Sequence, residues 1–228
     1  PHAVSVVNAE LQRREWPATA RNMGAAVWLD WELEPCPKAS IVIPSRFTTN
    51  FPQNLLPTLE ATDYPNFDVT IVDNSGESET KAEWYAQWSP GGAPIQVLWA
   101  DPSAEFNYSA VNNMAVANTD GDIVVLLNDA TEATAPLRLR EMVGWASRPE
   151  IGTVGLQLLD AADTIQHGGV VLGMFGLAEH LFGRMRPHSD SLIGHTDWIR
   201  NSLAVTAACV AVRRELWDRI GGFDERFI

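Results

Sequence analysis

The sequence predicts an α/β domain built on a mostly parallel sheet that is flanked by helices. Two observations favour this class. From residue 39 onward, short apolar runs alternate with helix-like segments, and each of these runs is unbroken by polar residues. Strands that are apolar on both faces are typical of a parallel sheet covered by helices on each side. The chain is therefore expected to be Rossmann-like, with one main domain.

Four of the apolar runs are predicted to form the central strands. They span 40–44, 69–73, 95–99 and 123–127. The expected helices between and after these strands span 54–62, 80–88, 109–118 and 137–147. Ser109 is the expected N-cap of the third helix, and Pro136 stands near the first turn of the fourth.

The pattern changes beyond Arg148 and before Ala39. Residues 153–159, 169–173 and 203–212 look like strands with longer loops, and 213–222 looks like a helix ended by Gly221 or Gly222. The first residues contain a short helix-like piece, 8–15, and an aromatic stretch, 27–33, before Pro35 and Pro37. We therefore expect an N-terminal extension over 1–38 and the main domain over 39–228.

The bulk composition limits the classes of function. The chain has 228 residues, 46% of them apolar, and a formal charge of -13, which argues against a general nucleic-acid binder. Cys36 and Cys209 show no CxxC spacing, which suits a reducing compartment. No apolar run approaches a membrane span, and no secretory signal is visible. The expected location is the cytoplasm, and peripheral association with the inner face of the membrane is compatible with the sequence.

Polar residues follow three of the predicted strands. Ser45 and Arg46 follow the first strand, Asp73 closes the second, and Asn128 and Asp129 follow the fourth. Any one of them alone is more often a simple turn former. Ligands of open parallel sheets bind outside the carboxyl ends of the strands. Three such ends on one sheet edge indicate a polar pocket there.

Six sequence blocks carry a resemblance to a known family. They are IVIPSRF, DYPNFDVTIVDNSGES, EFNYSAVNNMA, GDIVVLLNDATE, DTIQHGGVVLG and RRELWDRIGGFDERF. In order and spacing they resemble family 2 glycosyltransferases of the GT-A fold, over about residues 39–227. The subgroup that looks most similar acts in bacterial surface-polysaccharide synthesis of the O-antigen or rhamnan type. The segment before residue 39 is similar more loosely.

The resemblance implies an inverting transfer of a sugar from a nucleotide-diphosphate donor to the hydroxyl of an acceptor. It implies that Asp73 accepts a hydrogen bond from a ring N–H of uracil, thymine or guanine. The implied donors are therefore of the UDP, dTDP or GDP type, and the implied acceptor is a saccharide or a lipid-linked molecule. His167 maps to the acceptor side. The nucleotide-binding set that the resemblance implies is Pro44, Ser45, Arg46, Asp73, Asn107, Asn112, Asn113, Asn128 and Asp129.

Loop and helix capping remains an equal interpretation for each of Asn107, Asn112 and Asn113. His180, His188 and His195 have no metal-ligand spacing, and a satisfied or surface role is favoured for each of them.

The family's acidic metal motif falls on Asn128, Asp129 and Ala130. The resemblance implies a Mg²⁺ or Mn²⁺ ion that bridges a protein carboxylate and the donor diphosphate. Ala130 stands where the expected ligand would be, so the predicted metal site is weak and rests on Asp129.

An inverting transfer also needs a general base for the acceptor hydroxyl. In the family this acidic residue follows the GGFDE motif, which here is 221–225, and we therefore expect the base beyond Ile228. Two alternatives stay open: a non-catalytic nucleotide-sugar binding module, favoured by Ala130, and a sugar-phosphate nucleotidyltransferase. The latter ranks last, because the segment after the first strand, PSRFTTNFPQN, contains no glycine.

Overall fold

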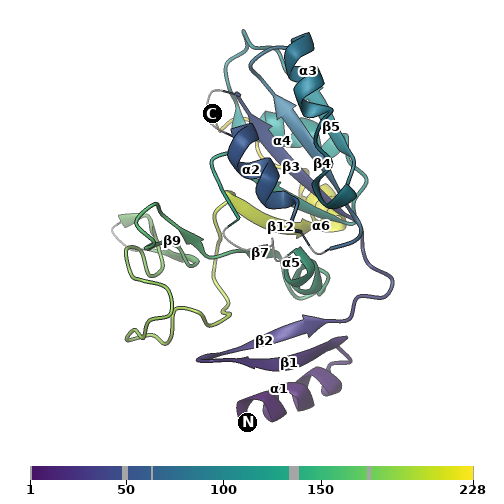
Figure 1. Ribbon diagram of the computed structural model, residues 1–228. Coiled ribbons are helices and arrows are strands. Elements are labelled where there is room, and N and C mark those ends of the chain that lie inside the picture. Colours follow the sequence, from purple (N-terminus) through teal and green to yellow (C-terminus); the bar gives the residue numbers. More distant parts are fainter. Residues whose placement is uncertain (1, 48–50, 63, 134–138, 174–175, 228) are drawn as a thin grey trace. The chain divides into compact units, whose positions relative to one another are not determined.

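The computed structural model describes residues 2–47, 51–62, 64–133, 139–173 and 176–227 (Figure 1). The chain groups into two compact units. Unit 1 comprises Pro1–Glu34 and Gly155–Thr206, and unit 2 comprises Pro35–Val154 and Ala207–Ile228. The expected domain division after residue 38 stays a prediction.

Unit 2 is built on a six-stranded sheet with the strand order β5-β4-β3-β6-β12-β7. The β3–β4, β4–β5 and β3–β6 pairs are parallel, whereas β12 runs antiparallel to β6. The strands are β3 (Ala39–Ser45), β4 (Phe67–Asp73), β5 (Ile95–Trp99), β6 (Ile123–Leu127), β7 (Thr153–Gly155) and β12 (Cys209–Arg213). The predicted α/β class and the mostly parallel sheet are confirmed.

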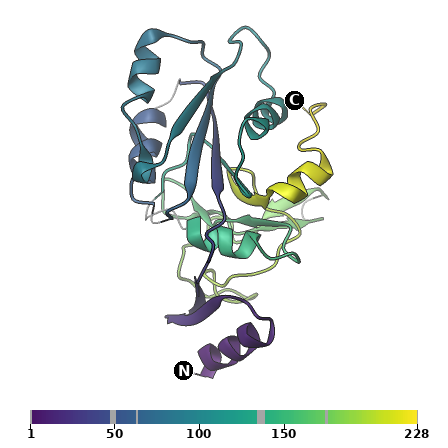
Figure 2. The same ribbon diagram turned by 90° about the vertical axis from the view of Figure 1, so that its right-hand side faces the viewer.

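Helices lie on both sides of this sheet, as the apolar strands predicted. In Figure 2, α2 and α3 lie on one side, and α4 and α6 lie on the other. Every residue of β3 and of β6 is buried, because both faces of these central strands are covered. The helices are α2 (Phe51–Leu59), α3 (Glu79–Tyr85), α4 (Tyr108–Ala117), α5 (Leu139–Ala146) and α6 (Arg214–Ile220), and η1 (Pro90–Gly92) is a short 3₁₀ turn.

Unit 1 contains shorter elements. Helix α1 (His2–Arg13) precedes an antiparallel hairpin of β1 (Ala18–Met23) and β2 (Ala26–Trp31). Its second segment holds two further antiparallel pairs, β8 with β9 and β10 with β11. These four strands are β8 (Leu158–Leu159), β9 (Ile165–His167), β10 (Val170–Leu172) and β11 (Ala178–His180). In the part of the chain that the structure describes, no helix is long and apolar enough to cross a membrane.

The N-cap predicted at Ser109 is wrong. Asn107 caps α4, because its backbone is extended and its side-chain oxygen accepts a hydrogen bond from the N–H of Ala110 at 2.9 Å. The end predicted for α6 is confirmed, since Gly221 adopts the left-handed conformation just after Ile220. Pro136 lies outside the described residues.

The strand predicted over 203–212 is only half right. Within it, only residues from Cys209 onward belong to β12, where they pair with β6. Leu203 is exposed, and Ala204 makes an isolated bridge to Val170. An apolar run becomes a strand only where a neighbouring strand accepts its hydrogen bonds. The aromatic stretch 27–33, which the sequence left unassigned, supplies most of β2.

Candidate functional site

Three strand ends meet at one edge of the unit 2 sheet. In the β3–β4 register, Ser45 lies opposite Asp73, and Asp73 lies opposite Trp99 of β5. On the other side of β3, Val42 lies opposite Leu126, which brings the residues after β6 level with the end of β3. The structure therefore brings the predicted residues Pro44, Ser45, Arg46, Asp73, Asn128 and Asp129 to the same edge.

Asp73 is fully buried and already engaged. Its Oδ1 accepts hydrogen bonds from the backbone N–H and the hydroxyl of Ser75, at 2.8 and 2.5 Å. Its Oδ2 accepts one from the hydroxyl of Tyr85 at 3.1 Å. A carboxylate offers about four acceptor positions, so about one position is left for a ligand. Asp73 thus organises this edge in addition to any contact with a base.

Lys81 supplies the counter-charge for Asp73. Its ammonium group lies 3.9 Å from Asp73 Oδ1 and donates a 2.7 Å hydrogen bond to the hydroxyl of Ser75. The same ammonium group lies 5.5 Å from the ring centroid of Phe47 and 5.8 Å from that of Trp99. Lys81 and Asp73 therefore compensate each other's charge beside the aromatic rings of Phe47 and Trp99.

Tyr85 belongs to the same group of residues. Its ring lies edge-on to Phe47, with 5.8 Å between the ring centroids. Burial raises the pKa of its hydroxyl, and so do the negative charge of Asp73 and the hydrogen bond to it. The hydroxyl is therefore a fixed donor. Lys81 and Tyr85 were missed by the sequence reasoning, although their spacing of four residues on one helix places both side chains on the same face.

Asn128 and Asp129 form a turn immediately after β6. The side-chain oxygen of Asn128 accepts a hydrogen bond from the N–H of Ala130 at 2.9 Å, which is an Asx-type turn. Burial raises the pKa of the Asp129 carboxyl, and the hydrogen bonds from the Ser45 hydroxyl and from the N–H groups of Ala130 and Arg46 offset this only in part. Asp129 thus faces the end of β3.

These residues do not present a set of ligands for a divalent cation. Asp129 is a single half-buried carboxylate, the Asn128 oxygen is engaged in its turn, and Ala130 has no ligand atom. Glu132 accepts a 2.7 Å hydrogen bond from the Asn54 side chain. Within the described ranges, no group of three or more His, Cys, Asp or Glu side chains is arranged to hold a metal ion. The weak metal site predicted at Asp129 stays a prediction.

Asn107 and Asn113 make contacts with the segment that follows α6. Asn107 donates a 2.7 Å hydrogen bond to the carbonyl of Glu225. Asn113 accepts one from the N–H of Phe223 at 2.9 Å and donates to the carbonyl of the same residue, also at 2.9 Å. Both side chains therefore hold the GGFDE segment against α4, and their nucleotide-binding role stays a prediction.

Four side-chain oxygens in unit 2 are buried and have no hydrogen-bond partner among the described residues: Oγ1 of Thr62 and Oδ1 of Asp68, Asn74 and Asn112. Of these four residues, Asn74 lies at the edge that carries the predicted site. Asn74 directly follows Asp73, and its backbone N–H donates to the carbonyl of Ser45 at 2.9 Å. A buried acceptor without a donor is costly unless a ligand or water supplies one. The sequence did not predict Asn74 as a site residue. Only the fold shows that its side-chain oxygen is buried without a donor.

Arg46 carries an exposed guanidinium at this edge. The group lies 5.9 Å from the ring centroid of Phe106, which precedes α4 by two residues. No ion pair joins Arg46 to an acidic residue in the described part of the chain. Among the described residues, therefore, no carboxylate neutralises the charge of Arg46, whereas Asp73 lies beside Lys81.

His167 lies in unit 1 and is only 2% exposed. Its Nε2 accepts a hydrogen bond from the N–H of Thr206 at 3.3 Å, and its Nδ1 lies 2.7 Å from Nδ1 of His180. Since Nε2 is an acceptor, the neutral ring carries its proton on Nδ1 and donates it to His180. Burial, followed by the charge of His180, lowers the pKa of His167 to about 4. The predicted place of His167 at the acceptor side stays a prediction.

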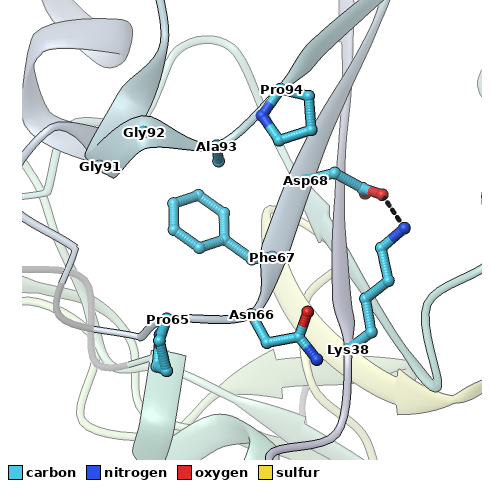
Figure 3. A pocket seen from close by; sticks show the side chains of 9 residues that line it. All are labelled: Lys38, Pro65, Asn66, Phe67, Asp68, Gly91, Gly92, Ala93 and Pro94. Atoms are coloured by element: carbon cyan, nitrogen blue, oxygen red, sulfur yellow. Dashed lines mark ion pairs between the residues drawn. The ribbon is translucent and has the colours of Figure 1, made fainter.

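A separate cavity of about 290 Å³ lies at the opposite edge of the sheet, where β3, β4 and β5 begin (Figure 3). Lys38 lines this cavity, and its ammonium group pairs with Asp68 at 2.7 Å and also with Asp120. The cation is therefore already compensated. None of the predicted site residues lines this cavity.

The fold is shared with known glycosyltransferases of the GT-A class. GalNAc-T7, solved with UDP, GalNAc and Mn²⁺, has a TM-score of 0.61 at 13% identity, covering 84% of this chain and 37% of that one. The mannosyltransferase PcManGT from Pyrobaculum calidifontis, solved with GDP-Man and Mn²⁺, has a TM-score of 0.54 at 16% identity, covering 83% and 48%. The chain therefore has the GT-A glycosyltransferase fold, which confirms the resemblance seen in its sequence blocks.

A curated relative is similar in sequence as well. The O-antigen biosynthesis protein RfbC of Myxococcus xanthus is 42% identical over 196 residues, which is 84% of this chain. The chain spans 15% of the length of that relative. No protein-family model matches the chain.

Proposed function

We propose that this chain forms the donor-binding part of a glycosyltransferase that acts in bacterial surface-polysaccharide synthesis. The enzyme takes a sugar from a nucleotide diphosphate and transfers it, with inversion, to the hydroxyl of a saccharide or lipid-linked acceptor. One observation carries the proposal: the polar cluster at the carboxyl ends of β3, β4 and β6 occupies the edge at which open α/β sheets bind ligands. The GT-A fold and the similarity to RfbC support the same assignment.

The nucleoside is assigned to the end of β4. Asp73 has about one free acceptor position, and Asn74 has a buried oxygen without a donor. A base N–H or a ribose hydroxyl would satisfy either of them. Phe47 and Trp99 supply aromatic surface beside them. This arrangement suits a base of the uracil, thymine or guanine type, because each has a ring N–H to donate.

The diphosphate is assigned to the ends of β3 and β6. Ser45 offers a hydroxyl, Arg46 offers a positive charge, and Asn128 and Asp129 close the edge on the other side. A leaving diphosphate gains negative charge during the transfer, so cations and hydrogen-bond donors at this place would stabilise the transition state. His167 is proposed for the acceptor side on the basis of the family resemblance alone.

Calorimetric titration of the chain with UDP, dTDP and GDP tests the donor site. We expect saturable binding of at least one of them, which addition of the matching nucleotide sugar would compete away. If none of the three binds, the proposed function is wrong.

Sugar transfer in the presence of a saccharide acceptor then separates an enzyme from a binding module, which Ala130 favours as the second candidate. Turnover of the donor indicates an enzyme, whereas saturable binding without turnover indicates a module.

A further inference from the structure

The diphosphate of a nucleotide sugar needs a counter-charge, and the described residues do not provide the usual one. A divalent ion would find a single carboxylate, Asp129, at the turn after β6. The Asp129 carboxylate also accepts hydrogen bonds from the hydroxyl of Ser45 and from backbone N–H groups, including that of Arg46. The counter-charge for the diphosphate must therefore come from another positive group at the same edge.

Two cations lie near this edge, and their surroundings differ. Lys81 lies beside the buried carboxylate of Asp73 and donates a hydrogen bond to Ser75, so its charge is already compensated within the protein. Arg46 is exposed, and no acidic partner of it is found among the described residues. Its backbone N–H donates to the Asp129 carboxylate, which fixes the residue at the junction of β3 and β6. Arg46 is thus the cation of the pair that remains available to a ligand.

The place of the guanidinium also favours an anion. It lies over the ring of Phe106, at 5.9 Å from its centroid, and Phe106 stands two residues before α4. The guanidinium has no acidic partner among the described residues, so its charge favours an anion as ligand. The planar guanidinium also matches the paired oxygens of a phosphate group.

We infer that Arg46 provides the counter-charge for the donor diphosphate, the role that a metal ion held by a carboxylate at position 130 would otherwise have. The inference rests on the proposed function, because it names the phosphate ligand of the same site. It implies that the preference of the chain for a nucleoside diphosphate over the bare nucleoside depends on the charge of residue 46 and persists without a divalent ion.

The test compares UDP, dTDP and GDP with uridine, thymidine and guanosine, in EDTA. Calorimetry gives the affinity for each diphosphate, and ligand-observed NMR gives that for each nucleoside. For the base that binds, Arg46→Gln should lower the affinity for the diphosphate at least tenfold and that for the nucleoside less than threefold, because a charge-assisted hydrogen bond is lost. Arg46→Lys keeps the charge but loses the planar fork, so it should lose less diphosphate affinity than Arg46→Gln does.

Arg219→Gln is the matched control. Arg219 is an exposed arginine in the last turn of α6, in the same unit, so its replacement removes the same charge elsewhere. It should leave both affinities unchanged. Circular dichroism of each variant checks that the fold is intact.

Several outcomes would overturn the inference. An equal loss of nucleoside and diphosphate affinity in Arg46→Gln would place Arg46 at the nucleoside, and no loss would remove it from the site. A wild-type preference for the diphosphate that disappears in EDTA and returns with Mn²⁺ would assign the counter-charge to a metal. If the wild type binds none of the nucleotides, the proposed function itself fails, and that result is distinct from binding that Arg46→Gln does not affect.

Discussion

The carboxyl edge of β3, β4 and β6 and the Gly155–Thr206 segment hold their polar groups in different ways. At the edge, the functional side chains lie in the last residues of buried parallel strands or directly after them, so the register of the sheet sets their positions. In the 155–206 segment the strands have only two or three residues, and the polar groups are held by turns and by one another. An example is His188, whose Nδ1 lies 2.6 Å from Asp197 Oδ2.

The two regions also differ in how they treat apolar surface. The apolar side chains of β3 and β6 are all buried. By contrast, seven large apolar side chains are exposed among the described residues of the second segment of unit 1, namely Leu172, Leu177, Leu192, Ile193, Trp198, Ile199 and Leu203. A parallel sheet requires burial on both faces. Of the seven exposed residues, only Leu172 belongs to a strand. Membership of the central sheet therefore predicts the burial of a side chain better than its apolar character alone does.

The largest expected effect concerns His167, a buried histidine of unit 1. His167 has a pKa of about 4, below its usual value, so the folded state resists its protonation. The stability that its neutral form contributes is complete above about pH 6.5 and is lost as the pH falls towards 4. The loss is at most about 3 kcal/mol, at about 1.4 kcal/mol per pKa unit. Urea unfolding at several pH values between 7 and 4 measures the free energy of unfolding, and in His167→Gln this part of its pH dependence should vanish. The same pH dependence in the variant and the wild type would contradict the burial argument.

The next expected effect lies at the sheet edge. Asp73→Asn should weaken nucleotide binding by about 2 kcal/mol, because an amide nitrogen replaces an acceptor oxygen that faces Ser75 or Tyr85. Calorimetry with UDP, dTDP and GDP measures it. Tyr85→Phe removes one donor to the same carboxylate and should cost about 1 kcal/mol of stability with a smaller change in affinity. Unchanged affinity of Asp73→Asn for every nucleotide would take Asp73 out of the site.

A smaller effect is expected for the turn after β6. Ala130 is exposed beside Asp129, so Ala130→Asp adds a second carboxylate there. Mn²⁺ binding in the presence of UDP or dTDP should tighten by about tenfold or more, as changes in the ligand shell typically produce. Ala130→Asn serves as the uncharged control and should gain less. If Ala130→Asp gains nothing, position 130 does not face the diphosphate.

The smallest expected effect is on Asp129 itself. Burial raises its pKa, so the folded state binds its proton more tightly than the unfolded chain does. The associated stability is therefore present at acid pH and is lost as the pH rises through the raised pKa. Asp129→Asn should increase the free energy of unfolding at pH 7 by about 1 kcal/mol or less and should have no such effect near pH 3. Chemical denaturation at both pH values measures this; a destabilised variant at pH 7 would show that its hydrogen bonds outweigh its burial.

Much of unit 2 could be predicted from the sequence. The strands 95–99 and 123–127 were predicted with the bounds that β5 and β6 have, because continuous apolar runs between polar turns have few alternatives. Helix α4 was displaced by one residue, since the sequence does not show whether Asn107 or Ser109 is the residue with extended backbone. Unit 1 was predicted less well: β1, β9 and β11 were not foreseen, because their short segments carry no clear period.

By itself the sequence determined the fold class and the strand ends that carry polar residues. These properties follow from the order of apolar and polar residues along the chain, which is local information. Only the tertiary structure decided which of those residues are still available to a ligand. It pairs Asp73 with Ser75, Lys81 and Tyr85, ties Asn107 and Asn113 to residues 223–225, and leaves Arg46 without an acidic partner among the described residues. The physical reason is that hydrogen bonds and charge compensation depend on neighbours in space, and these neighbours come from distant parts of the chain.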